Sequence, residues 1–412
     1  MLKFDLTVVG GGAAGLACAY IAAKHGLKTL LVEKQLFLGG LMTLGQVIPV
    51  MKTCDEGINI EFYRDLIKFM SDKKAQITYR DGNEGWFNPE LLKIYFPLML
   101  KSVGVKILSD SKIVKINKGH KCKVLSRGLS VYFETNYFVD ATGNGNFSCE
   151  FFGKIFLPKE NFSQAESLRF ILGGINSKKF VDFLKNSDDD GDISTFCNVD
   201  GDIYFSTSYT RNSEKSKVLK PLFEKAITGK VLKPSDSEYF QMFSVPKMPG
   251  CVSFNCPRIY PGNTPFDRAE AYIAGGEQIL RYIDFCKDFL PGFENCFLSS
   301  IATVPGLREE SRVQCEHVFS EDDILSDKIP ENPAFASDYP FDIHGKKNVL
   351  EKSKNSIWYM PFDTLRCTEN LFVVGRCMSA TLKAHSAART QKNCFSAGES
   401  VAKYLIKLKK LG

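Results

Sequence analysis

The sequence lacks several features that would define other classes of protein. It has no uninterrupted apolar run of about eighteen residues, so no membrane-spanning helix is predicted. Its 13 cysteines include no Cys-x-x-Cys pair, so neither a zinc knuckle nor a redox dithiol is evident. Its five histidines show no metal-ligand spacing, and we predict no metal. No leader is apparent, so we expect a cytoplasmic protein with mostly free, buried thiols.

The sequence is only modestly basic. Its formal net charge is +6, and the densest lysine groups lie at residues 112–123 and 407–410. No aromatic residues alternate with these lysines to stack on bases, so a solvated basic face is favoured over a nucleic-acid partner. A hydrophobic content of 44% over 412 residues is enough for a large core, which predicts two or three domains.

The most informative pattern is a glycine-rich turn that closes the apolar run starting at Phe4. Gly10 permits a tight turn out of the first strand, Gly12 lets the backbone approach a pyrophosphate, and Gly15 lets the next helix pack against the sheet. The second apolar run ends at Glu33, whose carboxylate can accept hydrogen bonds from ribose hydroxyls. Because strand, turn, helix, strand and acid occur in order, a dinucleotide site is favoured over a glycine-rich turn without a ligand. The motif alone fits a nicotinamide dinucleotide or FAD.

Three later segments can approach the same nucleotide. The glycine pair at residues 39–40 leaves room for a bulky ligand. The small residues 141–143 follow a strand-like run at 131–139. Near the C-terminus, the apolar segment 370–374 ends in a glycine and an arginine at 375–376, and such a strand needs a parallel sheet in which to lie.

In these segments the chain resembles FAD-dependent oxidoreductases of the glutathione-reductase-like superfamily, where they occur in the same order. More narrowly, it is similar to the broad bacterial family of FAD-dependent oxidoreductases. The supporting matches span most of the chain and lie at residues 37–40, 291–293, 306–309, 342–344 and 375–380. The chain departs from the family pattern at residues 310–312, where serine-arginine-arginine is usual.

The resemblance implies an α/β fold. It consists of a Rossmann-like FAD-binding domain with a parallel sheet, interrupted by an α+β substrate/cap domain. We predict FAD-binding segments at residues 1–155 and 356–412, with the cap at 156–355. The predicted cofactor-binding residues are Gly10, Gly12, Ala13, Ala14, Gly15, Glu33, Lys34, Gly39, Gly40, Met42, Thr43, Val114, Ala141, Thr142, Gly143, Gly375, Arg376 and Asn393. The longer predicted helices cover residues 59–73, 88–103, 264–290 and 394–408.

Two arginines are candidates for the active site: Arg308 as an anchor for the substrate and Arg389 beside the flavin. Arg308 carries a planar fork that can hold a carboxylate or phosphate at two points, and it lies in a matched family segment. The alternative is an ion pair with Glu309, Glu310 or Glu316. Arg389 precedes the last predicted helix and can stabilise negative charge on a reduced flavin, or else pair with an anionic group elsewhere.

A histidine and two cysteines complete the candidates. His344 can give or take a proton beside hydride transfer, with Asp342 on the same side of an extended segment to orient its ring. The alternative is a structural histidine. Cys54 and Cys394 raise thiol-redox chemistry or a covalent flavin, although a packed, inert thiol is favoured for each.

We therefore expect an FAD-dependent oxidoreductase that transfers a hydride between flavin N5 and a small polar metabolite. No second glycine-rich fingerprint occurs in the middle of the chain, so a dedicated NAD(P)H domain is not predicted. The alternatives are a flavoprotein acting on tRNA or on thiols and disulfides, and a binding protein that kept the fold without the cofactor. The substrate, the electron acceptor or donor and the oligomeric state are open.

Overall fold

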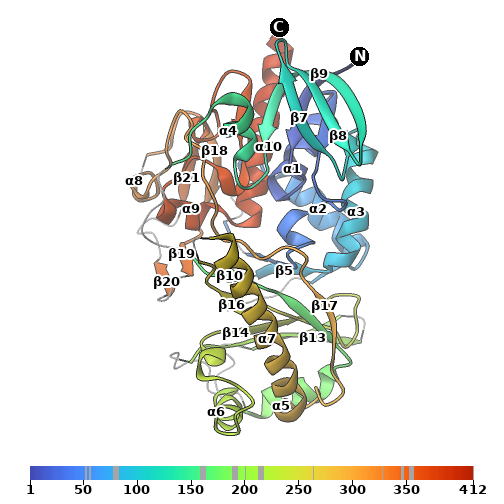
Figure 1. Ribbon diagram of the computed structural model, residues 1–412, viewed down its shortest axis with the longest axis vertical. Coiled ribbons are helices and arrows are strands. Elements are labelled where there is room, and N and C mark those ends of the chain that lie inside the picture. Colours follow the sequence, from blue (N-terminus) through green and yellow to red (C-terminus); the bar gives the residue numbers. More distant parts are fainter. Residues whose placement is uncertain are drawn as a thin grey trace.

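The computed structural model has two main parts along its longest axis (Figure 1). It describes residues 1–51, 53–54, 57–77, 83–157, 164–187, 194–199, 201–211, 218–262, 264–326, 328–344, 348–351 and 357–411. No helix within these ranges is both long and apolar enough to cross a membrane.

The first part is built on a seven-stranded sheet with five parallel strands. The parallel strands are β1 (Leu2–Val9), β2 (Thr29–Val32), β6 (Lys106–Leu108), β9 (Leu129–Asp140) and β22 (Leu371–Val373). The order is β6-β2-β1-β9, and β22 pairs with the end of β9. The antiparallel hairpin of β7 (Lys112–Asn117) and β8 (Lys121–Ser126) lies beside the beginning of β9. This parallel sheet confirms the predicted α/β class.

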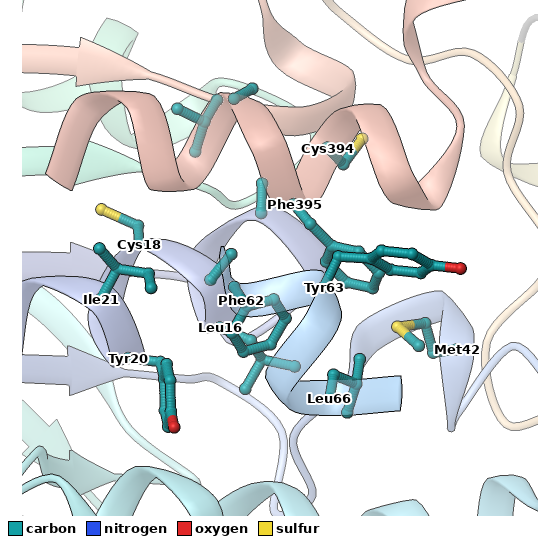
Figure 2. Close-up of a cluster of buried hydrophobic side chains, with 14 of the residues drawn as sticks. Leu16, Cys18, Tyr20, Ile21, Met42, Phe62, Tyr63, Leu66, Cys394 and Phe395 are labelled. Atoms are coloured by element: carbon teal, nitrogen blue, oxygen red, sulfur yellow. The ribbon is translucent and has the colours of Figure 1, made fainter. Parts of the chain in front are cut away.

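Helices cover this sheet and share one hydrophobic core with it. They are α1 (Ala13–Lys24), α2 (Glu61–Asp72), α3 (Pro89–Ser102) and α10 (Gln391–Leu411). The ring of Phe395 on α10 lies 5.2 Å from that of Phe62 on α2, with Leu16 of α1 in the same cluster (Figure 2). Helix α1 approaches α10 so closely that a Cβ on Gly398 would lie 2.1 Å from the carbonyl oxygen of Ala14.

The second part is an antiparallel sheet of six strands in the order β12-β13-β14-β15-β11-β17. Its strands are β11 (Phe170–Gly173), β12 (Thr195–Val199), β13 (Asp202–Tyr209), β14 (Phe240–Ser244), β15 (Val252–Phe254) and β17 (Phe297–Ile301). Because side chains alternate along a strand, Phe170 and Leu172 pack in a core with the helices of this part, whereas Ile171 joins the core of the first part. Those helices are α5 (Ser177–Ser187), α6 (Lys220–Thr228) and α7 (Pro265–Phe289), and α7 runs along this part in Figure 1.

A small sheet joins the two parts. It contains β3 (Pro49–Met51), β4 (Gln76–Ile77) and β5 (Asn83–Phe87). Trp86 is fully buried there, and its indole nitrogen donates to the carbonyl of Ser244 at 2.6 Å. Its ring centroid lies 5.6 Å from that of Phe243, so the second sheet rests on the first part through apolar contact as well as a hydrogen bond.

Shorter elements complete the fold. They are α4 (Asn146–Phe152), β10 (Glu166–Ser167), β16 (Arg258–Ile259), α8 (Glu321–Leu325), β18 (Pro333–Ser337), β19 (Phe341–His344), β20 (Asn348–Glu351), β21 (Trp358–Pro361) and α9 (Leu382–Ala388). Strand β18 pairs with β21, and the buried Phe335 shares the core of α1 and α10. The chain is thus beside α10 by residue 335, and the predicted division at 155/156 and 355/356 remains a prediction.

Most long helices lie where the sequence predicted them. Asn88 caps α3 by accepting from the backbone N–H groups of Glu90 and Leu91, and Thr264 caps α7. The last helix begins at Gln391, three residues before the predicted start, and α9 before it was not predicted. Eleven of the described cysteines are free, and seven of these are buried, while Cys315 and Cys367 form a disulfide.

The contact between α1 and α10 makes Gly398 a sensitive position. We expect Gly398→Ala to lower the free energy of unfolding by about 1–3 kcal/mol, because the added methyl group forces the helices apart. Urea denaturation followed by circular dichroism measures this. Gly276→Ala on α7 is the control, since its Cβ meets nothing within 4 Å and is expected to be neutral or stabilising. Equal midpoints for the two variants would contradict the packing argument.

Candidate cofactor and substrate site

A cavity of about 500 Å³ lies along the carboxyl ends of β1 and β9. Here β1 continues to β2 on one side and pairs with the later strand β9 on the other, and such a switch in strand order is where open α/β sheets bind their ligands. The lining comes from the loops after β1, β2 and β9, from η1 (Gly40–Met42), and from the segment before α10. Residues far apart in the sequence thus share one extended groove.

The three glycines of the first loop meet different surroundings. Gly10 has φ +106°, and a Cβ there would lie 2.4 Å from the carbonyl oxygen of Ala141. A Cβ on Gly15 would lie 1.9 Å from the carbonyl oxygen of Gly10, so α1 can pack this closely only without a side chain there. A Cβ on Gly12 meets nothing within 4 Å, and Gly12 lines the cavity. The room left at Gly12 is therefore space for a ligand.

Glu33 is held by backbone groups on both of its carboxylate oxygens. The N–H of Gly11 donates to Oε2 at 2.6 Å and that of Gln35 donates to Oε1 at 2.8 Å. An ionised carboxylate has about four acceptor sites. Glu33 also lines the cavity, so its remaining lone pairs can accept hydroxyl groups of a ribose.

Asp140 fixes the loop that follows β9. It is fully buried, and its carboxylate accepts from the N–H and hydroxyl of Thr142 and from the N–H and hydroxyl of Ser148. These four hydrogen bonds fold residues 141–148 over the end of the sheet. The predicted residues Ala141, Thr142 and Gly143 line the cavity as a result.

Most of the predicted cofactor residues line this cavity. They are Gly10, Gly12, Ala13, Ala14, Glu33, Lys34, Gly39, Gly40, Met42, Ala141, Thr142, Gly143, Gly375 and Arg376. Gly15 lies behind the loop, where it serves packing. The Thr43 hydroxyl donates to the carbonyl of Leu38 at 2.6 Å, and Nδ2 of Asn393 donates to that of Ala387 at 3.1 Å, while Oδ1 of Asn393 has no described partner. Val114 is exposed on β7, whereas its neighbour Ile113 reaches the cavity.

Several lining residues were not among the predicted cofactor-binding residues. They are Gln35, Leu41, Leu44, Ser111, Lys112, Ile113, Asn144, Asn146, Phe147, Glu150, Phe151, Val304, Leu307, Glu310, Gln391 and Cys394. Four of them belong to α4, a short helix that the apolar pattern did not reveal.

Buried polar atoms without partners collect at the end of the cavity near α10. Among the described residues, these include Arg389 Nε and Gln391 Oε1, and both side chains belong to the lining. Buried polar groups are normally hydrogen-bonded, so this end fits a polar ligand. Together with the open space at Gly12 and the acceptor sites of Glu33, the residues present fit a dinucleotide with a polar ring system.

Arg308 does not form any of the ion pairs that the sequence left open. Glu310 pairs with Arg376 at 3.2 Å, while Glu309 and Glu316 pair with Arg312 and Arg366. The Nη1 of Arg308 instead donates to the carbonyl of Ala165 at 2.6 Å. Burial and nearby arginines lower the pKa of Arg308 to about 9, which still leaves the guanidinium charged at neutral pH.

His344 bridges two charged side chains. Its Nε2 lies 3.0 Å from the carboxylate of Asp342, and its Nδ1 lies 3.0 Å from Nη2 of Arg258. Because an arginine only donates, Nδ1 is the acceptor and Nε2 carries the proton. Asp342 thus orients the ring, as the spacing predicted. Burial lowers the pKa of His344 to about 4, so the ring is neutral at physiological pH, and its predicted part in proton transfer stays a prediction.

Arg389 is the one predicted catalytic residue of the three that lines the cavity. Its Nη2 donates to the carbonyl of Asp342 at 2.9 Å and to Oε1 of Gln164 at 3.2 Å. Cys394 also reaches the cavity, and burial raises the pKa of its thiol to about 12. A thiol of this kind is a poor nucleophile at neutral pH. Cys54 is not among the lining residues.

The parallel sheet, the glycine loop and the acid after β2 define a dinucleotide-binding α/β protein. The chain belongs to the FAD-dependent oxidoreductase family, which it matches over residues 5–405. It is therefore an enzyme whose cofactor is FAD.

Known proteins are similar to this one either in part of the sequence or in the fold. Thiamine thiazole synthase from Pyrococcus horikoshii is 28% identical over 173 residues, 39% of this chain and 65% of that protein. Digeranylgeranylglycerophospholipid reductase from Methanococcus vannielii is 27% identical over 149 residues, 34% of this chain and 38% of that protein. The matched stretch thus spans less than two thirds of either relative. The structure of p-nitrophenol 4-monooxygenase from Pseudomonas putida has a TM-score of 0.53 at 11% identity, covering 100% of this chain and 82% of that chain, and this likeness concerns the fold alone.

The buried histidines predict a dependence of stability on pH. Burial lowers the pKa of His344 to about 4 and that of His385 well below its usual value. Between the unfolded value of about 6.5 and these folded values, the unfolded chain binds more protons, so stability falls as the pH is lowered from about 6.5 to 4. Each histidine contributes up to about 1.4 kcal/mol per pH unit.

Urea denaturation at several pH values measures this slope. We expect His344→Gln to make the slope between pH 6.5 and 4 shallower, because glutamine can keep hydrogen bonds but does not titrate. His120→Gln, at a half-buried position on the β7–β8 turn, is the matched control for the substitution itself. A slope that is unchanged in His344→Gln would show that this ring is not held neutral in the folded state.

Proposed function

We propose that this protein transfers a hydride between flavin N5 and a small polar metabolite. The observation that carries the proposal is the pair of unpartnered buried polar atoms, Arg389 Nε and Gln391 Oε1, in the lining of the cavity. They lie in the lining contributed by the segment before α10, where polar groups would meet the flavin ring and a polar substrate. When bound, the flavin supplies acceptance or donation of a hydride at N5.

The residues of this chain have separable tasks toward FAD. Backbone N–H groups at the start of α1 would face the pyrophosphate, with Gly12 leaving the space. Glu33 would accept the ribose hydroxyls through the lone pairs that Gly11 and Gln35 leave open. Arg389 would place positive charge near a reduced, anionic flavin.

The other readings have less support in the site. A binding protein that had lost the cofactor would not need the open space at Gly12 or the held carboxylate of Glu33. A thiol-disulfide reaction would need a reactive thiol at the cavity, where Cys394 is the lining cysteine among the described residues and has a raised pKa. The named relatives carry out different reactions, so none of them supplies the substrate.

Gly12→Val tests the cofactor site directly. The φ and ψ of Gly12 are −76° and −175°, which a β-branched residue adopts without strain, and its Cβ meets no neighbour. We therefore expect a folded protein that has lost FAD, because the valine methyl groups occupy the space of the pyrophosphate. Flavin absorbance per protein chain measures the loss.

Gly276→Val is the matched control, since it adds the same side chain on α7 away from the cavity. It should keep stoichiometric flavin. Circular dichroism of both variants confirms folding. Stoichiometric flavin retained in Gly12→Val would contradict the assigned site.

The raised pKa of Cys394 predicts a flavin that is bound without a covalent bond. Acid precipitation of the purified protein should leave a colourless pellet and release FAD into the supernatant, where its mass identifies it. Cys394→Ser should release the same amount. A yellow pellet in the original protein and a colourless one in Cys394→Ser would show instead that this thiol is attached to the flavin.

A further inference from the structure

Four arginines from separate segments gather where the two parts of the molecule meet. This arginine cluster consists of Arg169 between β10 and β11, Arg258 on β16, Arg308 after β17 and Arg389 after α9. Arg258, Arg169 and Arg389 all lie close enough to Arg308 to lower its pKa through repulsion. The fold therefore holds four like charges together, which is costly unless something opposes them.

Arg169 and Arg308 donate to neutral carbonyl groups. Arg169 is 3% exposed and donates to the carbonyl of Gln46 at 3.0 Å. Arg308 donates to the carbonyl of Ala165 at 2.6 Å, and Arg258 lies over the ring of Tyr239 with its guanidinium carbon 3.8 Å from the centroid. These partners orient the guanidinium groups without neutralising them.

One carboxylate shares the cluster among the residues that the structure describes. Asp342 lies 4.0 Å from Arg389 and 3.0 Å from the ring of His344. The His344 ring is neutral and cannot add positive or negative charge at pH 7. Arg169, Arg308 and Arg389 against the one carboxylate of Asp342 leave two positive charges without a described counter-charge.

The cluster opens to the cavity through Arg389. This residue lines the cavity, and its buried Nε has no hydrogen-bond partner among the described residues. Leu307, which precedes Arg308, is also part of the lining. The buried amide nitrogen of Gln164, beside Arg389, has no described partner either. Unpartnered donors and positive charge thus converge on this end of the cavity.

We infer that the arginine cluster binds the anionic groups of the substrate, so that the enzyme acts on a small molecule carrying carboxylate or phosphate groups. Both groups offer the planar or tetrahedral oxygens that an arginine fork grips at two points. His344 is a positioning residue in this arrangement, because its Nδ1 accepts from Arg258 while Asp342 holds the opposite side of the ring. The inference rests on the proposed function for the reaction, but the binding of an anion is measurable separately.

The test uses the full-length protein, with FAD content determined in each sample. Succinate and inorganic phosphate are titrated at constant ionic strength, with succinamide as the uncharged analogue of succinate. The readouts are the melting temperature and the spectrum of the bound flavin. We expect a saturable rise in melting temperature with succinate or phosphate and no rise with succinamide, since a ligand of the folded state stabilises it by mass action.

Arg308→Gln should weaken the anion effect by about tenfold or more and leave FAD content unchanged, because one charge-assisted contact is removed. Arg258→Gln serves as a second variant if Arg308→Gln does not fold. Arg127→Gln is the control, since its side chain is 78% exposed and lies outside the cluster. It should behave as the original protein.

The outcomes separate the two proposals. A saturable effect of succinate alone identifies carboxylate as the preferred group, and an effect of phosphate alone identifies phosphate. The anion site is overturned if neither anion has a saturable effect on the original protein, even when FAD is bound at full stoichiometry. It is also overturned if Arg308→Gln and Arg258→Gln respond to the anions as strongly as the original protein does. A protein that binds the anion but no FAD supports the arginine cluster while contradicting the proposed flavin function.

Discussion

Close approach of one backbone to another around the start of α1 is the constraint on which the rest of the site depends. The helix is bounded on one side by Gly10 and Ala141 of the sheet, and on the other by Gly398 of α10. At Gly10, Gly15 and Gly398 even a methyl group would overlap a backbone oxygen. Only this spacing brings the first turn of α1, the acid after β2 and the loop after β9 to the same cavity. The cofactor site therefore depends on the absence of side chains at a few positions more than on any single contact.

The second sheet and the segments beside it contribute three of the four arginines of the cluster. Its strand β11 presents one apolar face to its own helices and the other to Trp86 and Phe243 at the joint between the parts. This joint carries the segments with Arg169, Arg258 and Arg308 toward Arg389 on the C-terminal segment. Arg169 and Arg308 donate to backbone carbonyls, which do not neutralise their charge, and this is why we propose an anionic ligand there.

Local signals in the sequence were sufficient for many elements of the fold. The capping residues Asn88 and Thr264, each followed by proline, start helices α3 and α7 within one residue of the predicted positions. Residues 240–254 form two strands, β14 and β15, because the segment between them turns at Lys247 and Gly250, both with positive φ. Helix α9 escaped prediction because it is only seven residues long and buried nearly throughout, which removes the amphipathic pattern.

The sequence by itself determined the class of fold and the dinucleotide, because glycine spacing and an acid at the end of a strand are local requirements of the βαβ unit. It placed Arg308, His344 and Arg389 as candidates without showing what surrounds them. Only the tertiary structure decided that the acids beside Arg308 in sequence pair with other arginines, that Arg258 bonds His344, and that Arg169 belongs with them. The physical reason is that electrostatic partners are selected by distance in space, and the folding of two sheets against each other sets those distances.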